Sequence, residues 1–388
     1  MKRWLIYCIL FAGTSHYTYA QDTINRVPFL EMRGYVKDLQ GLFFADDLSS
    51  LSSTNLLHNR LNFRLNMSSR LTARLELRNR IFWGDQIAET PNFAHVIDQY
   101  SGLLKLSHIW VDENKFVAHS VIDRLMVQYA TDQWDLRIGR QRINWGLNTI
   151  WNPNDLFNAY NFLDFDYEER PGNDAVRVQH FFRNNTAAEF AIKPGKHKNE
   201  TIGAFLYRFN TSQFDIQLLA GVFNSDYVIG GGWAGHIKEA GFKGEISYFH
   251  PMDVPADTSG VWSMSVMADQ TFKGDWYVSA SILYNSSPPE NPFTVINPFT
   301  SDLTAKNLFP FRYTFYTGAM KSFSPITSLS MAVIYSPKHH ALILFPSFTW
   351  NVANNFDLGL IVQSAYADIS HAYRTTGNAI FLRSKWSF

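Results

Sequence analysis

The chain ends in the stretch Ala379-Ile380-Phe381-Leu382-Arg383-Ser384-Lys385-Trp386-Ser387-Phe388. Read at period two, one face carries Ile380, Leu382, Ser384, Trp386 and Phe388, and the other carries Ala379, Phe381, Arg383, Lys385 and Ser387. Side chains of a β-strand alternate between its two faces, so this strand would present one mostly apolar face and one mostly polar or basic face. Such a strand suits a wall with lipid on one side and water on the other. An edge strand of a soluble sandwich would show the same alternation, so the rest of the chain has to distinguish the two.

The first residues predict export. Lys2 and Arg3 precede an apolar run from Trp4 to Gly13, and Thr18-Tyr19-Ala20 is an acceptable cleavage site. We therefore expect residues 1–20 to be a signal peptide, because the apolar run is too short to span a bilayer. The one cysteine of the chain lies inside this segment. The mature protein would then have no thiol for catalysis or for binding a metal.

Composition narrows the class. Aromatic residues make up 16% of the chain and charged residues 18%, yet no segment after residue 20 approaches the ~18 consecutive apolar residues of a membrane helix. The remaining 388 − 20 = 368 residues show no linker and no change in composition, so we expect residues 21–388 to form a single domain. An exported, aromatic-rich chain without long apolar runs indicates a transmembrane β-barrel. The balanced charge, with 34 basic and 34 acidic residues, argues against a nucleic-acid partner.

Alternation along the chain predicts an all-β, antiparallel up-and-down barrel of about 18 strands, with 16 strands as the alternative. The clearest hairpin joins residues 56–66 to residues 70–82, each with an apolar face and an arginine-rich face. Short turns alternate with longer segments such as 83–121 and 144–173, which we assign to outer loops; this sorting suits an even number of strands. The predicted strands are 29–45, 56–66, 70–82, 122–130, 134–143, 174–183, 186–193, 201–210, 213–223, 227–237, 240–249, 261–270, 275–285, 308–321, 326–335, 341–350, 355–366 and 376–388.

Three segments carry a resemblance to a known family. They read GRQRINWG at 139–146, WNPNDLFN at 151–158 and EERPGNDAVR at 168–177. This set resembles porin-like outer-membrane β-barrels of Gram-negative bacteria, which are distantly similar to alginate-export and phosphate-selective porins. The strand ending in Phe388 is similar to their closing strand, which serves as the signal for the barrel-assembly machinery. The resemblance covers about residues 122–180 and implies a channel in the cell outer membrane, in contact with lipid and lipopolysaccharide; it implies no particular solute.

The connection after Ile143 is too long for a simple turn and is rich in aromatic and acidic residues. A barrel of 16–18 strands leaves an aqueous lumen unless a segment folds inward, and aromatic side chains on a loop need burial. We therefore predict that residues 144–173 form a constriction or partial plug; the alternative is an outer loop packed on its neighbours at the rim. The residues assigned to this constriction are Trp145, Trp151, Asp155, Asp164, Asp166, Glu168, Glu169 and Arg170.

On the faces opposite the apolar stripes, we count 11 basic and 5 acidic side chains. A basic lumen attracts and selects anions; the alternative is that the arginines pair with Glu76 and with loop carboxylates. The first hairpin and the last strand should be neighbours in a closed barrel, so we expect Arg60, Arg64 and Arg383 to cluster. The predicted pore-lining residues are Arg60, Arg64, Arg70, Arg74, Glu76, Arg78, Arg80, Arg137, Arg177 and Arg383.

Signals for enzymatic chemistry are weak, since the chain shows no Gly-x-Ser-x-Gly elbow, no His-Glu-x-x-His and no nucleotide-binding loop. We expect no enzyme, no cofactor and no metal. The predicted function is a channel for passive diffusion of small polar or anionic solutes. One alternative is a substrate-specific channel or exporter for acidic sugars or phosphate-like anions. The other is a non-conducting barrel, such as an adhesin, a structural protein or an outer-membrane enzyme.

Overall fold

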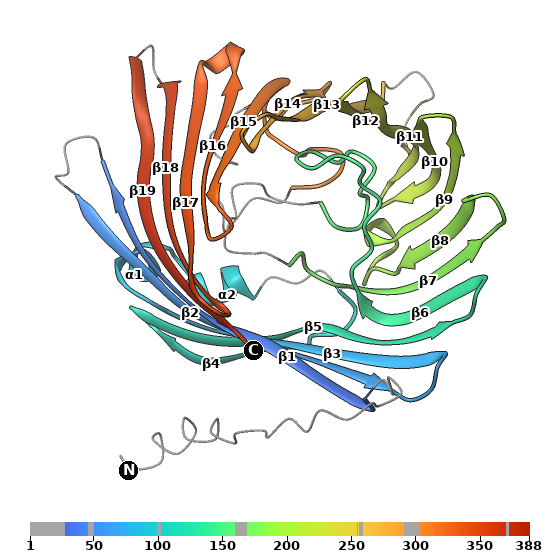
Figure 1. Cartoon of the computed structure of the whole chain (residues 1–388), viewed down its shortest axis with the longest axis horizontal. Coiled ribbons are helices and arrows are strands. Elements are labelled where there is room, and N and C mark those ends of the chain that lie inside the picture. The colour runs from blue at the N-terminus through green and yellow to red at the C-terminus, as the bar shows by residue number, and fades with distance from the viewer. Residues whose placement is uncertain are drawn as a thin grey trace.

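The computed structural model describes residues 28–45, 50–98, 102–159, 169–253, 255, 259–290, 303–369 and 372–388. The predicted signal peptide lies outside these residues. The described residues contain one antiparallel sheet of 19 strands, and it closes on itself. Strand β1 (Leu30–Phe44) pairs with β2 (Leu51–Asn66) along one edge and with β19 (Ala372–Ser387) along the other (Figure 1).

Eighteen strands form the ring, because β4 (Ser107–Glu113) pairs with β5 (Phe116–Ala130) as an added hairpin strand while β3 (Leu71–Trp83) pairs with β5 directly, and 19 − 1 = 18. The prediction of a closed 18-stranded antiparallel barrel is therefore confirmed. The remaining strands are β6 (Trp134–Gln141), β7 (Asn173–Phe181), β8 (Ala187–Lys193), β9 (Ile202–Thr211), β10 (Phe214–Phe223), β11 (Asp226–Ile237), β12 (Ala240–Pro251), β13 (Val261–Phe272), β14 (Trp276–Asn285), β15 (Tyr313–Ser324), β16 (Thr327–Ser336), β17 (Ala341–Ala353) and β18 (Phe356–Ile369).

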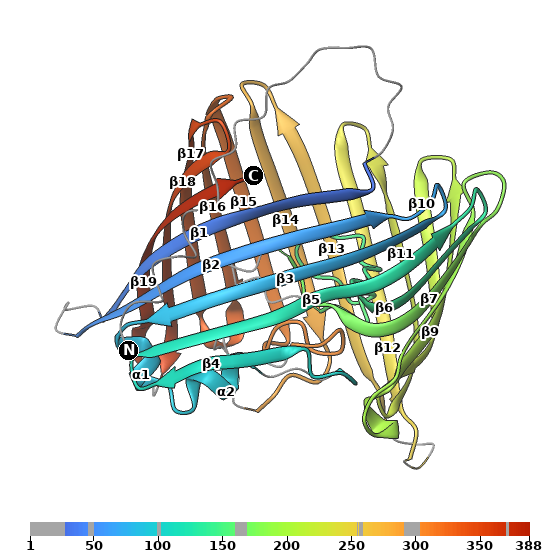
Figure 2. The ribbon, with the colours of Figure 1, turned by 90° about the horizontal axis from the view of Figure 1, so that it is seen from below.

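The strands tilt strongly against the barrel axis (Figure 2), as closure of a sheet requires. Two helices of five residues each, α1 (Asp85–Glu89) and α2 (Phe93–Ile97), follow β3. Among the described residues no helix is long and apolar enough to cross a membrane. We call the end of the barrel that carries residues 84–98, 102–115, 142–159 and 169–172 the loop end. The opposite end, with the turns at 67–70 and 131–133, is the turn end.

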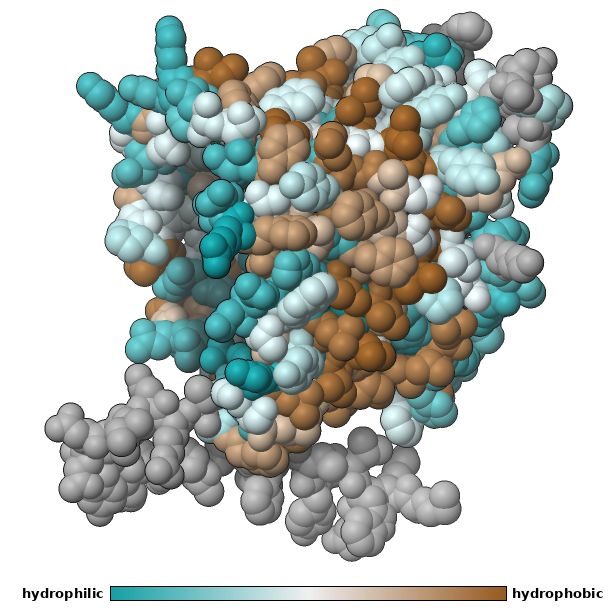
Figure 3. Space-filling view, turned by 90° about the vertical axis from the view of Figure 1, so that its right-hand side faces the viewer, coloured by the Kyte–Doolittle hydropathy of each residue, from teal (hydrophilic) through white to brown (hydrophobic). Residues whose placement is uncertain are grey.

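The outer surface of the wall is apolar. Leu218, Ile138 and Leu382 are each more than half exposed, at 53%, 53% and 55%, and brown side chains gather in a broad band across the face shown in Figure 3. In the closing strand, Leu382 and Trp386 are exposed whereas Ala379 and Phe381 are buried on the opposite face. The two faces read from the alternation of the last ten residues are thus the outer and the inner face of the wall, as expected of a strand that faces lipid.

The seam of the barrel closes on the last residue. The N–H of Phe388 donates to the carbonyl of Gly34, and the N–H of Gly34 donates to the carbonyl of Phe388, both at 2.9 Å. The ring of Phe388 lies over Gly34, since a Cβ built there would be 2.7 Å from ring atom Cζ and 2.4 Å from the carbonyl oxygen of Arg60. A side chain at residue 34 would therefore push the closing strand away from β1.

Several strand bounds predicted from the sequence are wrong in part; the strand expected at 56–66, for example, begins at Leu51. Residues 83–121 are not one long loop, because β4 and the first six residues of β5 lie within them. The strand expected at 308–321 begins at Tyr313. Pro346 does lie within a strand, as predicted, and it interrupts the ladder: β17 pairs with β18 at Leu344 and again at Ser347, with no pair between. Proline lacks the backbone N–H that would donate to β18 at this position.

Candidate functional site

Residues 142–159, here called the inner loop, fold into the barrel and lie against the inner side of the wall (Figure 1). Trp145 Nε1 donates to Glu189 Oε1 in β8 at 2.6 Å, and Gln217 in β10 donates to the carbonyl of Trp145 at 2.9 Å. Trp145 and Trp151 are 0% and 1% exposed. Trp145 and Trp151 are therefore buried inside the barrel rather than at an outer rim, and a wall carboxylate accepts the indole N–H of Trp145.

One carboxylate holds the backbone of the inner loop. Glu245 in β12 accepts the backbone N–H groups of Leu147, Asn148 and Asn154, at 2.5, 2.9 and 2.9 Å. Glu245 is 1% exposed. Buried backbone donors need partners, and an irregular loop cannot supply them from its own carbonyls, so this wall residue satisfies them.

The glycines of β11 make room for the loop. A Cβ at Gly230 would lie 2.9 Å from Asn154 Oδ1, and a Cβ at Gly232 would lie 3.0 Å from Asn154 Nδ2 and 3.0 Å from Leu147 Cδ1. Asn154 Nδ2 also donates to the carbonyl of Gly231 at 2.8 Å. The triple glycine, which weakens this strand on its own, allows the loop backbone to approach the wall closely.

Apolar side chains fill part of the interior at the loop end. The ring centroid of Trp151 lies 6.4 Å from that of Phe309 and 6.2 Å from that of Tyr316. Ile87 of α1 and Phe93 of α2 are buried in the same cluster, against wall residues such as Phe82 and Phe381. Water is excluded from packing of this kind, so an aqueous path through the described part of the barrel has to follow the polar sections of the wall.

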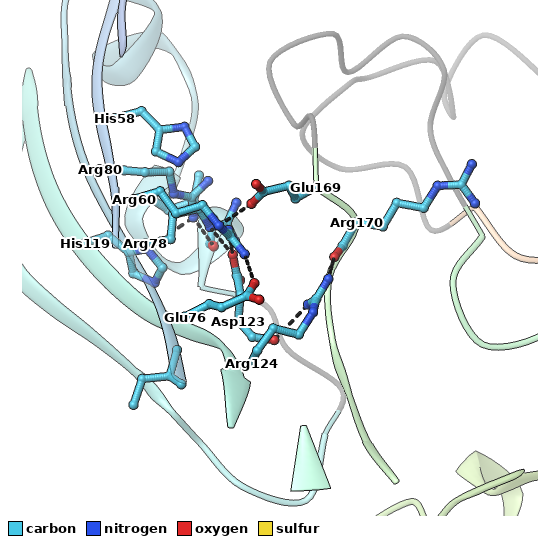
Figure 4. Close-up of polar contacts among 12 residues, drawn as sticks. His58, Arg60, Glu76, Arg78, Arg80, His119, Asp123, Arg124, Glu169 and Arg170 are labelled. Carbon is cyan, nitrogen blue, oxygen red and sulfur yellow. Dashed lines mark hydrogen bonds and ion pairs between the residues drawn. The ribbon is translucent and has the colours of Figure 1, made fainter. Parts of the chain in front are cut away.

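The charge cluster, which comprises Arg60, Glu76, Arg78, Asp123, Arg124 and Glu169, lies on such a section (Figure 4). Arg60 Nη1 donates to Asp123 Oδ2 at 2.5 Å, and Arg60 Nη2 donates to Glu76 Oε2 at 2.6 Å. Arg60 Nε forms an ion pair with Glu169. Arg78 Nε lies 3.1 Å from Asp123 Oδ2. Arg60 and Arg78 thus contact three carboxylates, in agreement with the alternative prediction that lumen arginines pair with Glu76 and with loop acids. Arg124 donates instead to the backbone carbonyls of Asp123 and Arg170.

Sequence reasoning missed Asp123. Alternation with Leu125, Val127 and Tyr129 would place it on the lipid face. In the structure β5 is irregular here: Arg124 pairs with Glu76 and Ile122 pairs with Leu77, so Asp123 has no partner of its own in β3. A bulge of this kind re-aims one side chain, and it turns Asp123 inward beside Arg124. The signal in the sequence was a charged pair interrupting an apolar stripe.

Glu169 and Arg170 lie at the end of the connection, shortly before β7. Glu169 pairs with the wall residue Arg60, whereas the side chain of Arg170 bonds the inner loop. Arg170 Nη1 lies 2.7 Å from Asp155 Oδ2 within the inner loop, and the carbonyl of Arg170 accepts from Arg124 Nη2 at 2.6 Å. Burial raises the pKa of Asp155 to about 7. Burial also raises the pKa of Glu169, and the nearby carboxylates of Glu76 and Asp123 add to that increase. Asp164, Asp166 and Glu168, assigned to the same constriction, lie outside the described residues.

A second group of cations, here called the basic patch, consists of Arg64, Arg74 and Arg137. Arg64 and Arg74 stand directly opposite each other in the pairing of β2 with β3. Arg137 lies near Arg74 and bonds Asp135 at 2.6 Å. Like charges opposed across strands are destabilising, so this patch has no evident structural purpose. It lies toward the turn end of the same part of the wall as the charge cluster.

The other predicted pore-lining residues are scattered. Arg70 is exposed in the turn at 67–70, Arg80 bonds the carbonyl of Ile97 at 3.2 Å, and Arg177 pairs with Glu189 at 2.6 Å. The expected cluster of Arg60, Arg64 and Arg383 is wrong. Across β1, Arg60 is opposite Tyr35 whereas Arg383 is opposite Leu39, which separates them by about 13 Å along the strand.

Similarity to known proteins is structural only. No protein-family model matches the chain, and no characterised protein matches its sequence. The structure of OccAB4 from Acinetobacter baumannii matches with a TM-score of 0.59 at 8% identity, over 94% of this chain and 100% of that one. OpdQ from Pseudomonas aeruginosa matches with a TM-score of 0.58 at 7% identity, over 93% and 99%. The outer membrane protein opdK from Pseudomonas aeruginosa matches with a TM-score of 0.53 at 8% identity, over 92% and 99%.

The fold is that of an outer-membrane β-barrel. At these identities the likeness extends to the fold alone, and the similarity to alginate-export and phosphate-selective porins stays a prediction. Arg140 and Asp174, from the segments 139–146 and 168–177, have a structural role. Arg140 Nε donates to Asp174 Oδ1 at 2.8 Å, and Asp174 Oδ2 accepts the backbone N–H of Leu104 at 2.9 Å. This pair holds the segment that leads into β4.

Proposed function

We propose that this barrel is an outer-membrane channel for passive diffusion of small polar solutes and that it prefers anions. The observation that carries the proposal is the basic patch. Arg64 and Arg74 oppose each other across two strands, and Arg137 adds a third cation with Asp135 as its bonded carboxylate. Cations arranged in this way on a low-dielectric wall concentrate anions, and mobile anions would relieve their mutual repulsion.

The inner loop supports a narrow rather than a wide pore. It is tied to β8, β10 and β12 through Glu189, Gln217 and Glu245, and it carries Asp155 and its partner Arg170. A barrel of this strand number without an inward segment would leave a broad aqueous channel. We therefore propose that the connection between β6 and β7 forms the constriction of the pore.

Export and assembly belong to the same proposal. Residues 1–20 would direct the chain across the inner membrane, and the strand ending in Phe388 would be read by the barrel-assembly machinery. The exposed apolar band of the wall (Figure 3) would then contact lipid, with lipopolysaccharide at the loop end.

Planar-bilayer conductance of the refolded protein under a potassium chloride gradient tests the proposal. We expect a steady pore whose reversal potential favours chloride. Arg74→Gln should lower the chloride-to-potassium permeability ratio by roughly twofold. The matched control is Arg33→Gln, because Arg33 is 79% exposed and pairs with Glu31 at 3.5 Å. A folded barrel that conducts no current would overturn the channel and favour an adhesin, a structural protein or an enzyme.

A second candidate is a substrate-specific channel, and a cavity favours it. The cavity measures about 510 Å³ and opens at the loop end between the inner loop, β7 and the β8–β9 connection. Its lining combines Asn158, Lys193 and Glu200 with the ring of Phe223, a mixture of polar and apolar groups common in ligand sites of this volume. Saturable block of the current by one acidic sugar or phosphate-like anion would support this candidate, and unchanged current with every such solute would exclude it.

A further inference from the structure

We propose that Glu169 is a selectivity-determining residue whose carboxylate occupies, as a built-in competitor, an oxyanion site on the wall that Arg60 forms, with Arg78 and Arg124 beside it. This inference rests on the proposed channel function. It states that Glu169 limits the anion preference of the pore. The wild-type pore should therefore select anions less strongly than a pore that lacks the charge of Glu169.

The first argument is burial. The Arg60 side chain is 1% exposed although it stands on the interior wall, and Glu169 remains 35% exposed. Two of the carboxylates that contact Arg60 come from the neighbouring wall strands, Glu76 at 2.6 Å and Asp123 at 2.5 Å. Glu169 alone among these three acids comes from the loop connection, and it is the most exposed of them. Glu169 therefore lies between Arg60 and the solvent of the lumen.

The second argument is charge. The wall strands β2, β3 and β5 contribute three guanidinium groups and two carboxylates to the charge cluster, so the wall by itself carries one excess positive charge. Glu169 brings the cluster to neutrality. Charge-assisted contacts between a guanidinium and a carboxylate are the strong kind, so the ion pair with Arg60 shows that this wall accepts an oxyanion at that position.

The third argument is placement. The residue after Glu169 is fixed twice: Arg170 Nη1 lies 2.7 Å from Asp155 Oδ2, and the carbonyl of Arg170 accepts from Arg124 at 2.6 Å. These bonds hold the main chain beside the wall, so Glu169 is presented to Arg60 by a fixed neighbour. A solute anion would have to compete with the carboxylate of Glu169. Because this carboxylate is tethered beside Arg60, its effective concentration there is high.

The surroundings of Glu169 also predict how the site responds to pH. It is faced by Arg60 from β2, by Glu76 from β3, and by Asp123 and Arg124 from β5, and Arg78 from β3 contacts Asp123 (Figure 4). Burial, together with Glu76 and Asp123, raises the pKa of Glu169, so it should become neutral at a higher pH than an ordinary glutamate. Mild acidification of the wild type should therefore raise the chloride-to-potassium permeability ratio, as removal of the charge of Glu169 does.

The test compares reversal potentials under a potassium chloride gradient for the wild type, Glu169→Gln, Glu169→Asp and a control. Glu169→Gln keeps the size of the side chain and removes its charge, so the chloride-to-potassium permeability ratio should rise by about twofold or more. Glu169→Asp should keep a ratio close to that of the wild type. The control Glu113→Gln changes the same charge at the end of β4, in an exposed position on the outer hairpin, and should also match the wild type.

Repeating the measurement at pH 7 and pH 5 provides a second readout. The ratio of the wild type should rise on acidification by a larger factor than that of Glu169→Gln. A conducting wild type whose ratio is unchanged by Glu169→Gln at both pH values would overturn the inference while leaving the channel intact. A wild type that does not conduct would instead overturn the proposed function on which the inference rests.

Discussion

Glu245 Oε2 accepts the backbone N–H of Asn154 at 2.9 Å, which joins a wall strand to a loop 91 residues away in the sequence. The other oxygen of the same carboxylate accepts the N–H groups of Leu147 and Asn148. Three backbone N–H groups of the inner loop thus share one acidic side chain of the wall as their acceptor.

Glu245→Ala should release the inner loop. Three buried N–H groups would lose their acceptor, and each unsatisfied donor costs about 1–3 kcal/mol, so we expect the free energy of unfolding to fall by roughly 3 kcal/mol or more. Urea unfolding in lipid vesicles measures the change. The control is Asp215→Ala, since Asp215 is exposed and bonds Asn210 at 2.9 Å. Equal losses in the two variants would show that Glu245 does not anchor the loop.

Gly232→Ala should displace the inner loop where Gly231→Ala should not. A Cβ at Gly232 would lie 3.0 Å from both Leu147 and Asn154 of the loop and 2.9 Å from the carbonyl oxygen of Gly244, whereas a Cβ at Gly231 would meet only the wall, 3.2 Å from the carbonyl oxygen of Gln217 and 3.4 Å from Leu218. Arg142 is exposed at the start of the loop, so trypsin cleavage after Arg142 reports on loop packing. Cleavage should be faster in Gly232→Ala alone. The interpretation of the triple glycine as space for the loop fails if both variants resist trypsin equally.

Loop packing should weaken as the pH rises from about 4 to about 7. Burial raises the pKa of Asp155 from 3.8 in the unfolded chain to about 7, so the folded state retains a proton that the unfolded state has lost. Stability from this group is complete below about pH 4, falls by at most about 1.4 kcal/mol per pH unit up to pH 7, and is then constant. Thermal unfolding of the wild type and Asp155→Asn between pH 5 and pH 8 checks this. The difference between the two should depend on pH; a constant difference contradicts the assignment.

Gly34→Val should impair closure of the barrel. Its side chain would collide with the carbonyl of Arg60 and with the ring of Phe388, at the seam where β1 and β19 meet. We expect a smaller fraction of refolded protein with the compact mobility that unheated barrels show in detergent gels. Gly203→Val is the control, because the nearest atom to a Cβ at Gly203 is 3.6 Å away, on Ile192. Similar refolding yields for both variants would show that the seam tolerates a side chain.

Much of the fold could be predicted because a strand between lipid and water must alternate. The faces of the final strand are an example: Leu382 is 55% exposed and Phe381 is 5% exposed, as the spacing of apolar residues indicated. Burial of Trp145 and Trp151 also followed from a simple requirement, since large aromatic side chains on a long connection have few other places to pack. Both inferences use only the local chain and the solvent around it.

The exact register of the strands and the positions of their bulges could not be predicted. A bulge at Asp123 adds one residue to β5 and turns a carboxylate inward, and alternation alone cannot show where such an insertion falls. The same holds for the register at the seam, where Arg383 is opposite Leu39 and not near Arg60. Each outcome depends on hydrogen bonds between strands, which are distant in sequence.

The amino-acid sequence by itself determined that the chain forms a closed wall with an apolar outside, because the energy of burying or exposing each side chain depends on its alternation along a strand. Only the tertiary structure decided which interior charges remain available to solutes. Arg60 is neutralised by Glu76, Asp123 and Glu169, whereas Arg64 and Arg74 face each other. The physical reason is that Coulomb interactions depend on distances across the barrel, which register, bulges and inward loops set together.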